Sequence, residues 1–336
     1  MKRPTVQIEF IVEPDHAGTR LDSFLAAQLR DLSRTRIQAL MDEGRVLVNG
    51  LAAKPSYRIE VNEIIAIEIP QPPEPAVTPE PIPLDILYED ADIAVINKPA
   101  NMIVHPGAGA DAGTMVAALR HRFGAGDGDG LSSVGGPLRP GIVHRLDKGT
   151  SGAIIVARND AAHKRLVEAF RGREVEKTYL ALLHGNLKGE SGRIEMPIAR
   201  DLRHRSRMTA RRREGREART DWRVRFRVGA FTLVEADLHT GRTHQIRVHF
   251  SALAAPVVGD TLYGAPRQER VGNTVLPSLE RNFLHAARVA FDHPRTSERV
   301  EFRAPLPSEL QAYLRNIARA TGIDSARVDA ALREFL

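Results

Sequence analysis

A cluster of prolines is the feature that most constrains how this chain can fold. Seven prolines fall close together, at positions 70, 72, 73, 75, 79, 81 and 83. Proline fixes φ and lacks a backbone N–H, so the stretch is extended and semi-rigid and has no core of its own. It predicts a linker over residues 70–84, which separates a short N-terminal module from a long C-terminal body.

The composition indicates a folded protein with a basic surface. The 336 residues are 42% hydrophobic, and Lys and Arg number 48 against 42 Asp and Glu, a formal net charge of +6. That balance favours a polyanionic partner. Cysteine is absent, which excludes a thiol nucleophile, disulfides and a cysteine-built zinc site. No apolar run is long enough for a membrane span and no signal-peptide core is present, so we expect a cytoplasmic protein with no membrane partner.

Residues 15–69 predict a small α/β module. Apolar residues at helical spacing predict one helix near 21–29 and a second near 37–41, with Ser33 as the N-cap of the second. Alternating apolar residues then lead to Asn49-Gly50, a strong hairpin signal, and those from 59 to 69 predict the returning strands.

Two arginines of this module stand where the helix dipole disfavours cations. Arg34 and Arg36 lie in the first turn of the predicted second helix. A bound phosphate would offset that cost, whereas a solvated basic face is the alternative. The segments 19–22, 33–34 and 44–50 (Thr-Arg-Leu-Asp, Ser-Arg and Gly-Arg-Val-Leu-Val-Asn-Gly) resemble the alpha-L RNA-binding module of ribosomal proteins. The resemblance implies RNA contacts at Arg34, Arg36 and Arg45.

The body after the linker contains more predicted strands than helices. Strands are predicted near 93–96, 153–156, 179–183, 222–228 and 231–238, and helices over 114–123, 160–171, 243–253 and 308–320. The two kinds of element do not alternate strictly. They therefore favour an α+β fold with a mixed, mainly antiparallel sheet, flanked by helices and loops, over a doubly wound sheet. We expect this domain over 85–310, followed by a helical tail over 311–336.

The densest group of polar residues lies at 141–152, Gly-Ile-Val-His-Arg-Leu-Asp-Lys-Gly-Thr-Ser-Gly. A strand ending near Val143 and another beginning near Ala153 would hold this loop at both ends and expose its side chains. Asp147 has cationic neighbours in the sequence, which favour an ionised carboxylate, so it can act as a nucleophile or base. A turn aspartate that only accepts backbone hydrogen bonds is the alternative.

Residues 144–152 resemble the signature of RluA-type pseudouridine synthases, in which His-Arg-Leu-Asp precedes a turn rich in Lys, Gly, Ser and Thr. Further segments match in the expected order, at 87–90, 95–99, 104–107, 176–181 (Glu-Lys-Thr-Tyr-Leu-Ala), 241–249 (Gly-Arg-Thr-His-Gln-Ile-Arg-Val-His), 285–286 and 304–307. The resemblance covers about 85–310. It is strongest to the D subtype, which acts on large-subunit ribosomal RNA.

The resemblance implies an isomerase that needs no cofactor and no metal. The bond between uracil N1 and the ribose breaks, and the base is rejoined through C5. Asp147 would be the catalytic carboxylate, Arg247 its ion-pair partner, and Tyr179 would pack on the flipped uracil. Flipping is needed because the reacting atoms are hidden in a stack, and Arg145 would fill the gap it leaves.

Further RNA contacts and the partner follow from the same resemblance. Contacts are expected at His144, Lys148, Lys98, Arg242 and His244. The expected partner is 23S ribosomal RNA or a large-subunit precursor, bound by a monomer. The alternatives are a synthase of another subtype that acts on other ribosomal or transfer RNA uridines, and a non-catalytic ribosome-assembly factor with the same fold.

Two further patterns bear on the chemistry. One carboxylate among cations suits a rearrangement better than glycoside hydrolysis, which uses two carboxylates. His239, His244 and His249 are spaced by five, which does not stack them on one helix face, and no carboxylate completes a set of metal ligands. No metal site is therefore predicted.

Residues 200–227 form the most basic stretch, with twelve arginines. Those at 203, 205 and 207 and those at 223, 225 and 227 alternate, as they would on one face of a strand. The stretch predicts a surface that follows the phosphates of RNA, and a solubilising face is the alternative.

Neutralising Arg211, Arg212 and Arg213 together should flatten the salt dependence of RNA binding. Fewer phosphate contacts release fewer counterions, so affinity falls less steeply as salt rises. Binding of ribosomal RNA measured over a salt series tests this expectation. An unchanged slope in the triple variant would remove this stretch from the RNA-binding surface.

Overall fold

The computed structural model describes residues 5–29, 32–70, 77–107, 112–124, 130–204, 206–210 and 214–336. The chain forms two compact units, Met1–Pro75 and Ala76–Leu336. The predicted RNA contacts Arg211, Arg212 and Arg213 lie outside the described residues, as do residues 71–76 of the predicted linker. Within the described ranges no helix is both long and apolar enough to cross a bilayer.

The first unit packs two helices on a four-stranded sheet of order β1-β4-β2-β3. The elements are β1 (Thr5–Ile11), α1 (Leu21–Gln28), α2 (Arg34–Asp42), β2 (Val46–Val48), β3 (Leu51–Ala52) and β4 (Ile64–Pro70). Asn49 and Gly50 join β2 to β3 with φ values of 47° and 81°, the left-handed conformation of a tight hairpin turn. β1 pairs with β4 along its whole length, so the sheet begins before the predicted start of the module at residue 15.

A buried carboxylate organises the helices of this unit. The Asp22 side chain, at the start of α1, is fully buried and accepts hydrogen bonds from Arg20, Arg34 and Gln38. Burial alone would raise the pKa of Asp22, but these donors outweigh it and hold the pKa well below its usual range. One face of the Arg34 guanidinium is therefore committed to joining α2 to α1.

The other two arginines predicted to contact RNA in this unit also pair with acids. Ser33 caps α2 as predicted, accepting from the Arg36 N–H at 3.2 Å. Arg36 pairs with Glu43 at 3.4 Å, and Arg45 pairs with Glu43 at 2.9 Å. All three guanidinium groups keep exposed surface, so their RNA contacts stay a prediction.

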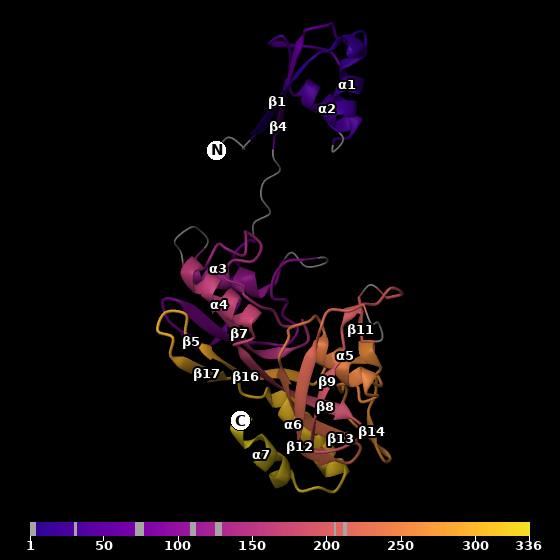
Figure 1. Ribbon diagram of the computed structural model, residues 1–336. Helices are drawn as coiled ribbons and strands as arrows, with labels where there is room; N and C mark the ends of the chain where they lie inside the picture. The colour runs from indigo at the N-terminus through magenta and orange to yellow at the C-terminus, as the bar shows by residue number, and fades with distance from the viewer. Residues whose placement is uncertain are drawn as a thin grey trace. The chain divides into compact units, whose positions relative to one another are not determined.

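The second unit is built on a nine-stranded sheet (Figure 1). Its order is β5-β6-β7-β16-β8-β13-β12-β9, with β17 also paired to β16. Only the pairing of β7 with β16 is parallel, so the predicted mixed, mainly antiparallel sheet is confirmed. The strands are β5 (Asp85–Glu89), β6 (Ile93–Lys98), β7 (Ser151–Ala157), β8 (Glu176–His184), β9 (Ser191–Glu195), β12 (Arg219–Val228), β13 (Phe231–Leu238), β16 (Leu284–Asp292) and β17 (Arg299–Arg303).

Helices cover this sheet. They are α3 (Met115–Phe123), α4 (Asp160–Gly172), α5 (Gln245–Ala252), α6 (Ser308–Ala320) and α7 (Ser325–Leu332), close to the predicted ranges. In Figure 1, α4 lies beside β7, and α7 lies near β12, which it contacts. Two short hairpins, β10 (Ala199–Arg200) with β11 (Met208–Thr209) and β14 (Arg270–Val271) with β15 (Thr274–Val275), complete the unit.

Segments on both sides of the predicted catalytic domain belong to its core. Val77 is buried against α3, and the Glu80 carboxylate accepts from the Gly113 N–H at 2.9 Å. At the other end, α6 and α7 bury apolar side chains such as Leu314 and Leu332 in the main core. The compact unit therefore reaches from Ala76 to Leu336, beyond the predicted limits of 85 and 310.

One glycine permits the only parallel pairing among the described strands of this sheet. Gly152 in β7 has φ +112° and lies opposite Ala286 of β16. A Cβ at this position would stand 2.2 Å from the Ala286 carbonyl oxygen and 2.7 Å from its carbonyl carbon. A side chain here would be strained by the positive φ, and it would collide with main-chain atoms of Ala286 that cannot move without disturbing the sheet.

Gly152→Ala should lower the free energy of unfolding by roughly 2–5 kcal/mol, combining a strained backbone with overpacking. Gly322→Ala is the matched control, since its φ of +70° is also left-handed but no atom lies within 4 Å of its Cβ position. The control should lose only about 1–2 kcal/mol. Denaturant unfolding followed by the fluorescence of the single tryptophan, Trp222, measures both. Equal losses would show that the close approach to β16 is unimportant.

Candidate active site

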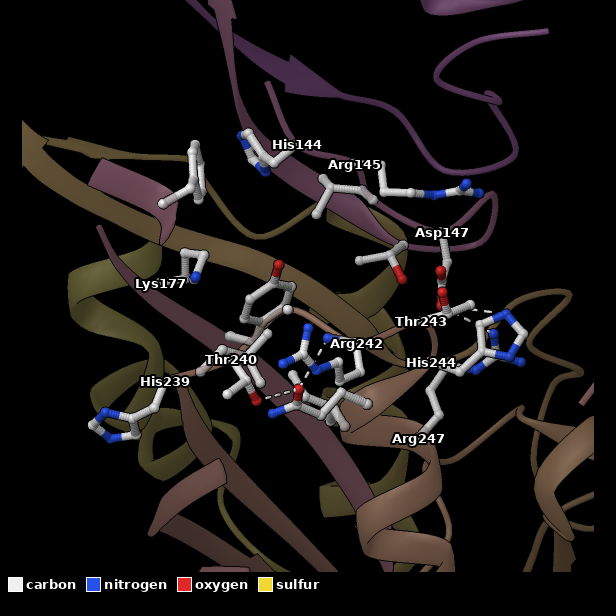
Figure 2. Close-up of a pocket in the computed structure, with 18 of the residues that line it drawn as sticks. His144, Arg145, Asp147, Lys177, His239, Thr240, Arg242, Thr243, His244 and Arg247 are labelled. Carbon is white, nitrogen blue, oxygen red and sulfur yellow. Dashed lines mark hydrogen bonds and ion pairs between the residues drawn. The ribbon is translucent and has the colours of Figure 1, made fainter. Parts of the chain in front are cut away.

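A cleft of about 520 Å³ opens on the second unit (Figure 2). It is lined by the loop 143–150 before β7, the end of α4, positions 177 and 179 of β8, and the segment 238–247 that leads into α5. A second hollow of about 540 Å³ adjoins it. The two share five residues, namely Arg145, Leu146, Asp147, His244 and Arg247.

Asp147 stands at this junction and is held by a guanidinium. Its carboxylate accepts a hydrogen bond from Arg247 Nη1 at 3.1 Å and keeps about 17% of its side-chain surface exposed. The other two nitrogens of the Arg247 guanidinium each donate to Asp260, Nε at 2.6 Å and Nη2 at 2.9 Å. Asp260 thus fixes the guanidinium as a fork, and the remaining nitrogen points at Asp147.

The charges of this trio reinforce one another. Burial alone would lower the pKa of Arg247, but hydrogen bonds and negative charge from Asp260, joined by the charge of Asp147, raise it above its usual value. Arg247 therefore stays cationic. Asp260 had no sequence motif to mark it, and its link to Arg247 is visible only in the folded chain.

His244 completes the surroundings of Asp147. It precedes α5 in the left-handed conformation, with φ 58°, and its Nε2 lies 3.8 Å from the Asp147 carboxylate. Its Nδ1 lies 2.8 Å from the hydroxyl oxygen of Tyr263, which fixes the ring. Burial lowers the pKa of His244 despite the charge of Asp147, so the contact is that of a neutral imidazole rather than an ion pair.

Tyr179 lines the same cleft from β8. Its ring is buried, and burial, aided by the negative charge of Asp147, raises the pKa of the Tyr179 phenol well above its usual value. The hydroxyl therefore keeps its proton. Among the described lining residues of this cleft, Asp147 is the only acid; Asp260, which borders the second hollow, has both oxygens on Arg247.

His144 braces the loop that carries Asp147. The expected strand at 142–143 is only a single bridge from Ile142 to Val156. Beyond that bridge, the Ile155 N–H of β7 donates to His144 Nε2 at 2.8 Å, so an imidazole replaces a backbone acceptor at the strand edge. Burial, with the nearby charge of Lys177, lowers the pKa of His144 to about 3. The ring is therefore neutral and cannot act as a cationic RNA contact.

Lys98 has a structural role instead of the predicted one. Its side chain is fully buried, and its ammonium donates to the carbonyls of Pro99 at 2.7 Å, Met102 at 2.9 Å and Lys148 at 3.4 Å. Burial lowers the pKa of Lys98 to about 7. The prediction that Lys98 contacts RNA is wrong, because an ammonium with no exposed surface cannot reach a phosphate. It ties the end of β6 to the residue after Asp147.

Arg145 and Lys148 are exposed on the loop, and Figure 2 shows Arg145 extending outward beside Asp147. No hydrogen bond or ion pair joins either to Asp147 among the described residues, so the cation that holds this carboxylate comes from α5 and not from the loop. Arg242 also borders the cleft, and its Nε donates to the Glu217 carbonyl at 2.9 Å.

The cleft holds more cations than the sequence predicted. Arg171, Arg173, Lys177 and Arg216 border it in addition to the expected residues. Only Lys177 carried a sequence signal, because it belongs to the matched segment 176–181. It stands two positions before Tyr179 in β8 and so shares its face. The positive side chains along its wall make the cleft suited to bind a polyanion.

The basic stretch 200–227 is partly structural. Arg223 and Arg225 both pair with the buried Glu235, and Arg227 pairs with Glu190 at 3.0 Å. These belong to β12, as predicted. Residues 203, 204, 206 and 207 lie between β10 and β11 without strand structure, so the alternation of arginines there does not mark one face of a strand.

The three histidines spaced by five do not converge. His239 Nε2 contacts Asp221 at 3.1 Å, His249 is buried between Thr220 and the Met196 carbonyl, and His244 faces Asp147. Each has its own protein partners.

Asp260→Asn should lower the free energy of unfolding by about 3 kcal/mol, because it leaves the buried charge of Arg247 with a single exposed carboxylate. The matched control is Glu190→Gln, which removes an ion pair whose acid is 79% exposed and should cost less than about 1 kcal/mol. Denaturant unfolding of the two variants gives the comparison. Equal effects would contradict a clamping role for Asp260.

Comparisons with known proteins identify the family to which this chain belongs. The family model for RNA pseudouridylate synthase matches residues 92–252, and that for the S4 domain matches residues 19–65. The uncharacterized RNA pseudouridine synthase YlyB of Bacillus subtilis (strain 168) is 42% identical over 313 residues, which cover 93% of this chain and 99% of that protein.

Two other proteins are similar over much of the chain. The ribosomal large subunit pseudouridine synthase D of Xanthomonas campestris pv. campestris is 39% identical over 322 residues, covering 94% of this chain and 93% of that protein. The structure of human RNA pseudouridylate synthase domain containing 1 has a TM-score of 0.50 and 31% identity, covering 66% of this chain and 83% of that one. The predicted resemblance to RluA-type enzymes is confirmed: the chain belongs to the RNA pseudouridine synthase family and carries an N-terminal S4 domain.

Proposed function

We propose that this enzyme converts uridines of the large-subunit ribosomal RNA to pseudouridine, with Asp147 as the catalytic carboxylate. The observation that carries the proposal is the Asp147–Arg247 contact of 3.1 Å inside a cleft whose other charged lining residues, among those described, are arginines and a lysine. A carboxylate with exposed surface and a fixed counter-charge is suited to act on a neutral nucleoside.

The chemistry is an isomerisation. The bond from uracil N1 to ribose C1′ breaks, a bond from C5 to C1′ forms, and the proton that C5 loses is balanced by the proton that N1 gains. Asp147 assists the departure and return of the base from its position beside the sugar. Hydrolysis of the same bond would need a second carboxylate to activate water, and the described lining of the cleft offers none.

Access to the target requires that the nucleotide leaves its stack. We infer that the uracil enters the 520 Å³ cleft and packs on Tyr179, whose buried ring forms part of the wall. Extrusion costs a few kcal/mol, which contacts elsewhere must supply. We expect the exposed guanidinium of Arg145 to occupy the space that the flipped base leaves in the RNA stack. Lys148 and Arg242 would contact backbone phosphates.

The choice of RNA rests on the relatives and on the module. A protein 39% identical over almost the whole chain is named for the ribosomal large subunit, and the S4 domain supplies a second RNA-binding unit. We therefore favour 23S ribosomal RNA, or a precursor of the large subunit, over transfer RNA.

Asp147→Asn should abolish pseudouridine formation and leave RNA affinity within about threefold, because the change removes a charge but almost no volume. Pseudouridines are mapped chemically in total RNA from cells with the wild-type gene, without it, and with each variant. Asp292→Asn, an exposed carboxylate whose side chain is 61% accessible, is the control and should restore every site. Full activity of Asp147→Asn would show that Asp147 is not the catalytic carboxylate. If the sites lost without the gene lie only in transfer RNA, the substrate is transfer RNA and not ribosomal RNA.

A further inference from the structure

Lys177 is a cation in the cleft that the reaction chemistry above does not use. It lies on β8 and points into the cleft on the side away from Asp147 (Figure 2). No hydrogen bond or ion pair joins its ammonium to any other described residue. The ammonium lies over the ring of Phe170, whose centroid is 5.3 Å from Nζ.

The groups around Lys177 attract its positive charge but do not neutralise it. The aromatic face of Phe170 attracts a cation but leaves its hydrogen-bonding protons free. His144 stands against the same ring, 4.7 Å between centroids, and is neutral. Glu176, the residue before Lys177, pairs with Arg288 and Arg299.

The Lys177 side chain is partly buried and has no acidic partner among the described residues. Burial lowers the pKa of Lys177 to about 8, with no acid to oppose it. Buried cations are normally paired, because an uncompensated charge is costly to remove from water. A negatively charged ligand bound in the cleft would supply a counter-charge to Lys177.

We propose that Lys177 binds a backbone phosphate of the RNA beside the flipped uridine. The inference rests on the proposed function, since the flipped base is taken to lie on Tyr179. Alternation along β8 places Lys177 and Tyr179 on one face, roughly 6.6 Å apart by strand rise. With the sugar of that uridine at Asp147 and its base on Tyr179, the backbone that continues along the cleft can bring an adjoining phosphate within reach of Lys177.

A phosphate fits better than the uracil edge. The ammonium is a point charge with three donors and no fixed direction, which suits the tetrahedral oxygens of a phosphate diester. Arg171, which directly follows the Phe170 that contacts Lys177, and Arg173 also border the cleft and extend a cationic path on which a backbone can lie. Lys177 would thus help to fix which nucleotide of the RNA lies in the cleft, and it would not distinguish one base from another.

The test compares Lys177→Met, which keeps the length of the chain but removes the charge, with Lys177→Arg, which keeps the charge. Lys164→Met, an exposed lysine of α4 that does not line the cleft, is the matched control. The probe is a synthetic RNA centred on a uridine that the mapping experiment shows to depend on this gene. Copies with a single uncharged methylphosphonate at each position around that uridine accompany it. The fluorescence of Trp222 on unfolding checks that each variant is folded.

The expected result is a change in KM without a matching change in kcat. Lys177→Met should raise KM at least roughly tenfold, as the loss of one charge-assisted hydrogen bond predicts, with kcat within about twofold, and Lys177→Arg should recover most of the loss. One methylphosphonate position should weaken the wild type by a similar factor and leave Lys177→Met unaffected. A loss confined to kcat, or a methylphosphonate penalty equal in both proteins at every position, overturns the inference. A gene-dependent uridine found only in another RNA would correct the proposed substrate while leaving this comparison intact, and the absence of any such uridine would refute the proposed function itself.

Discussion

The fork of Arg247 between two carboxylates is the interaction on which the site depends. Asp260 takes two of its N–H groups and Asp147 a third. Because Asp260 is buried and holds the guanidinium by two hydrogen bonds, Arg247 cannot rotate to follow Asp147, and the Asp147 carboxylate must adopt the position that Arg247 dictates. A flexible surface ion pair would add little by comparison. Residues 100 positions apart in the chain are thereby held in one geometry.

The sheet supplies the frame for that fork. β7, which follows the Asp147 loop, pairs in parallel with β16, and β16 pairs in turn with β8, which carries Tyr179 and Lys177. The loop is fastened at both ends: His144 bonds to the edge of β7, and Lys98 at the end of β6 reaches the Lys148 carbonyl. The side chains that face the cleft therefore move with main-chain strands.

Much of the architecture follows from patterns of two and 3.6 residues, while the site depended on motif resemblance. Helices such as α3 and α4 and the strands β12 and β13 lie close to their predicted ranges because their apolar periodicity is long and their ends are marked. Asp147 and Arg247 were predicted as partners from the resemblance alone, since nothing local links them. Asp260 was missed for the same reason: its partner lies on a helix 13 residues earlier, and no spacing rule connects a turn to that helix.

The bracing of the Asp147 loop determines which partner must change conformation when the complex forms. A loop already fastened to two strands has little freedom left to lose when a partner arrives, so the protein side of the complex is preorganised. The distortion needed to bring reactive atoms together must then be borne by the nucleic acid. An RNA segment that is already unpaired or bulged should be favoured over a regular duplex for this reason alone, before any base is recognised.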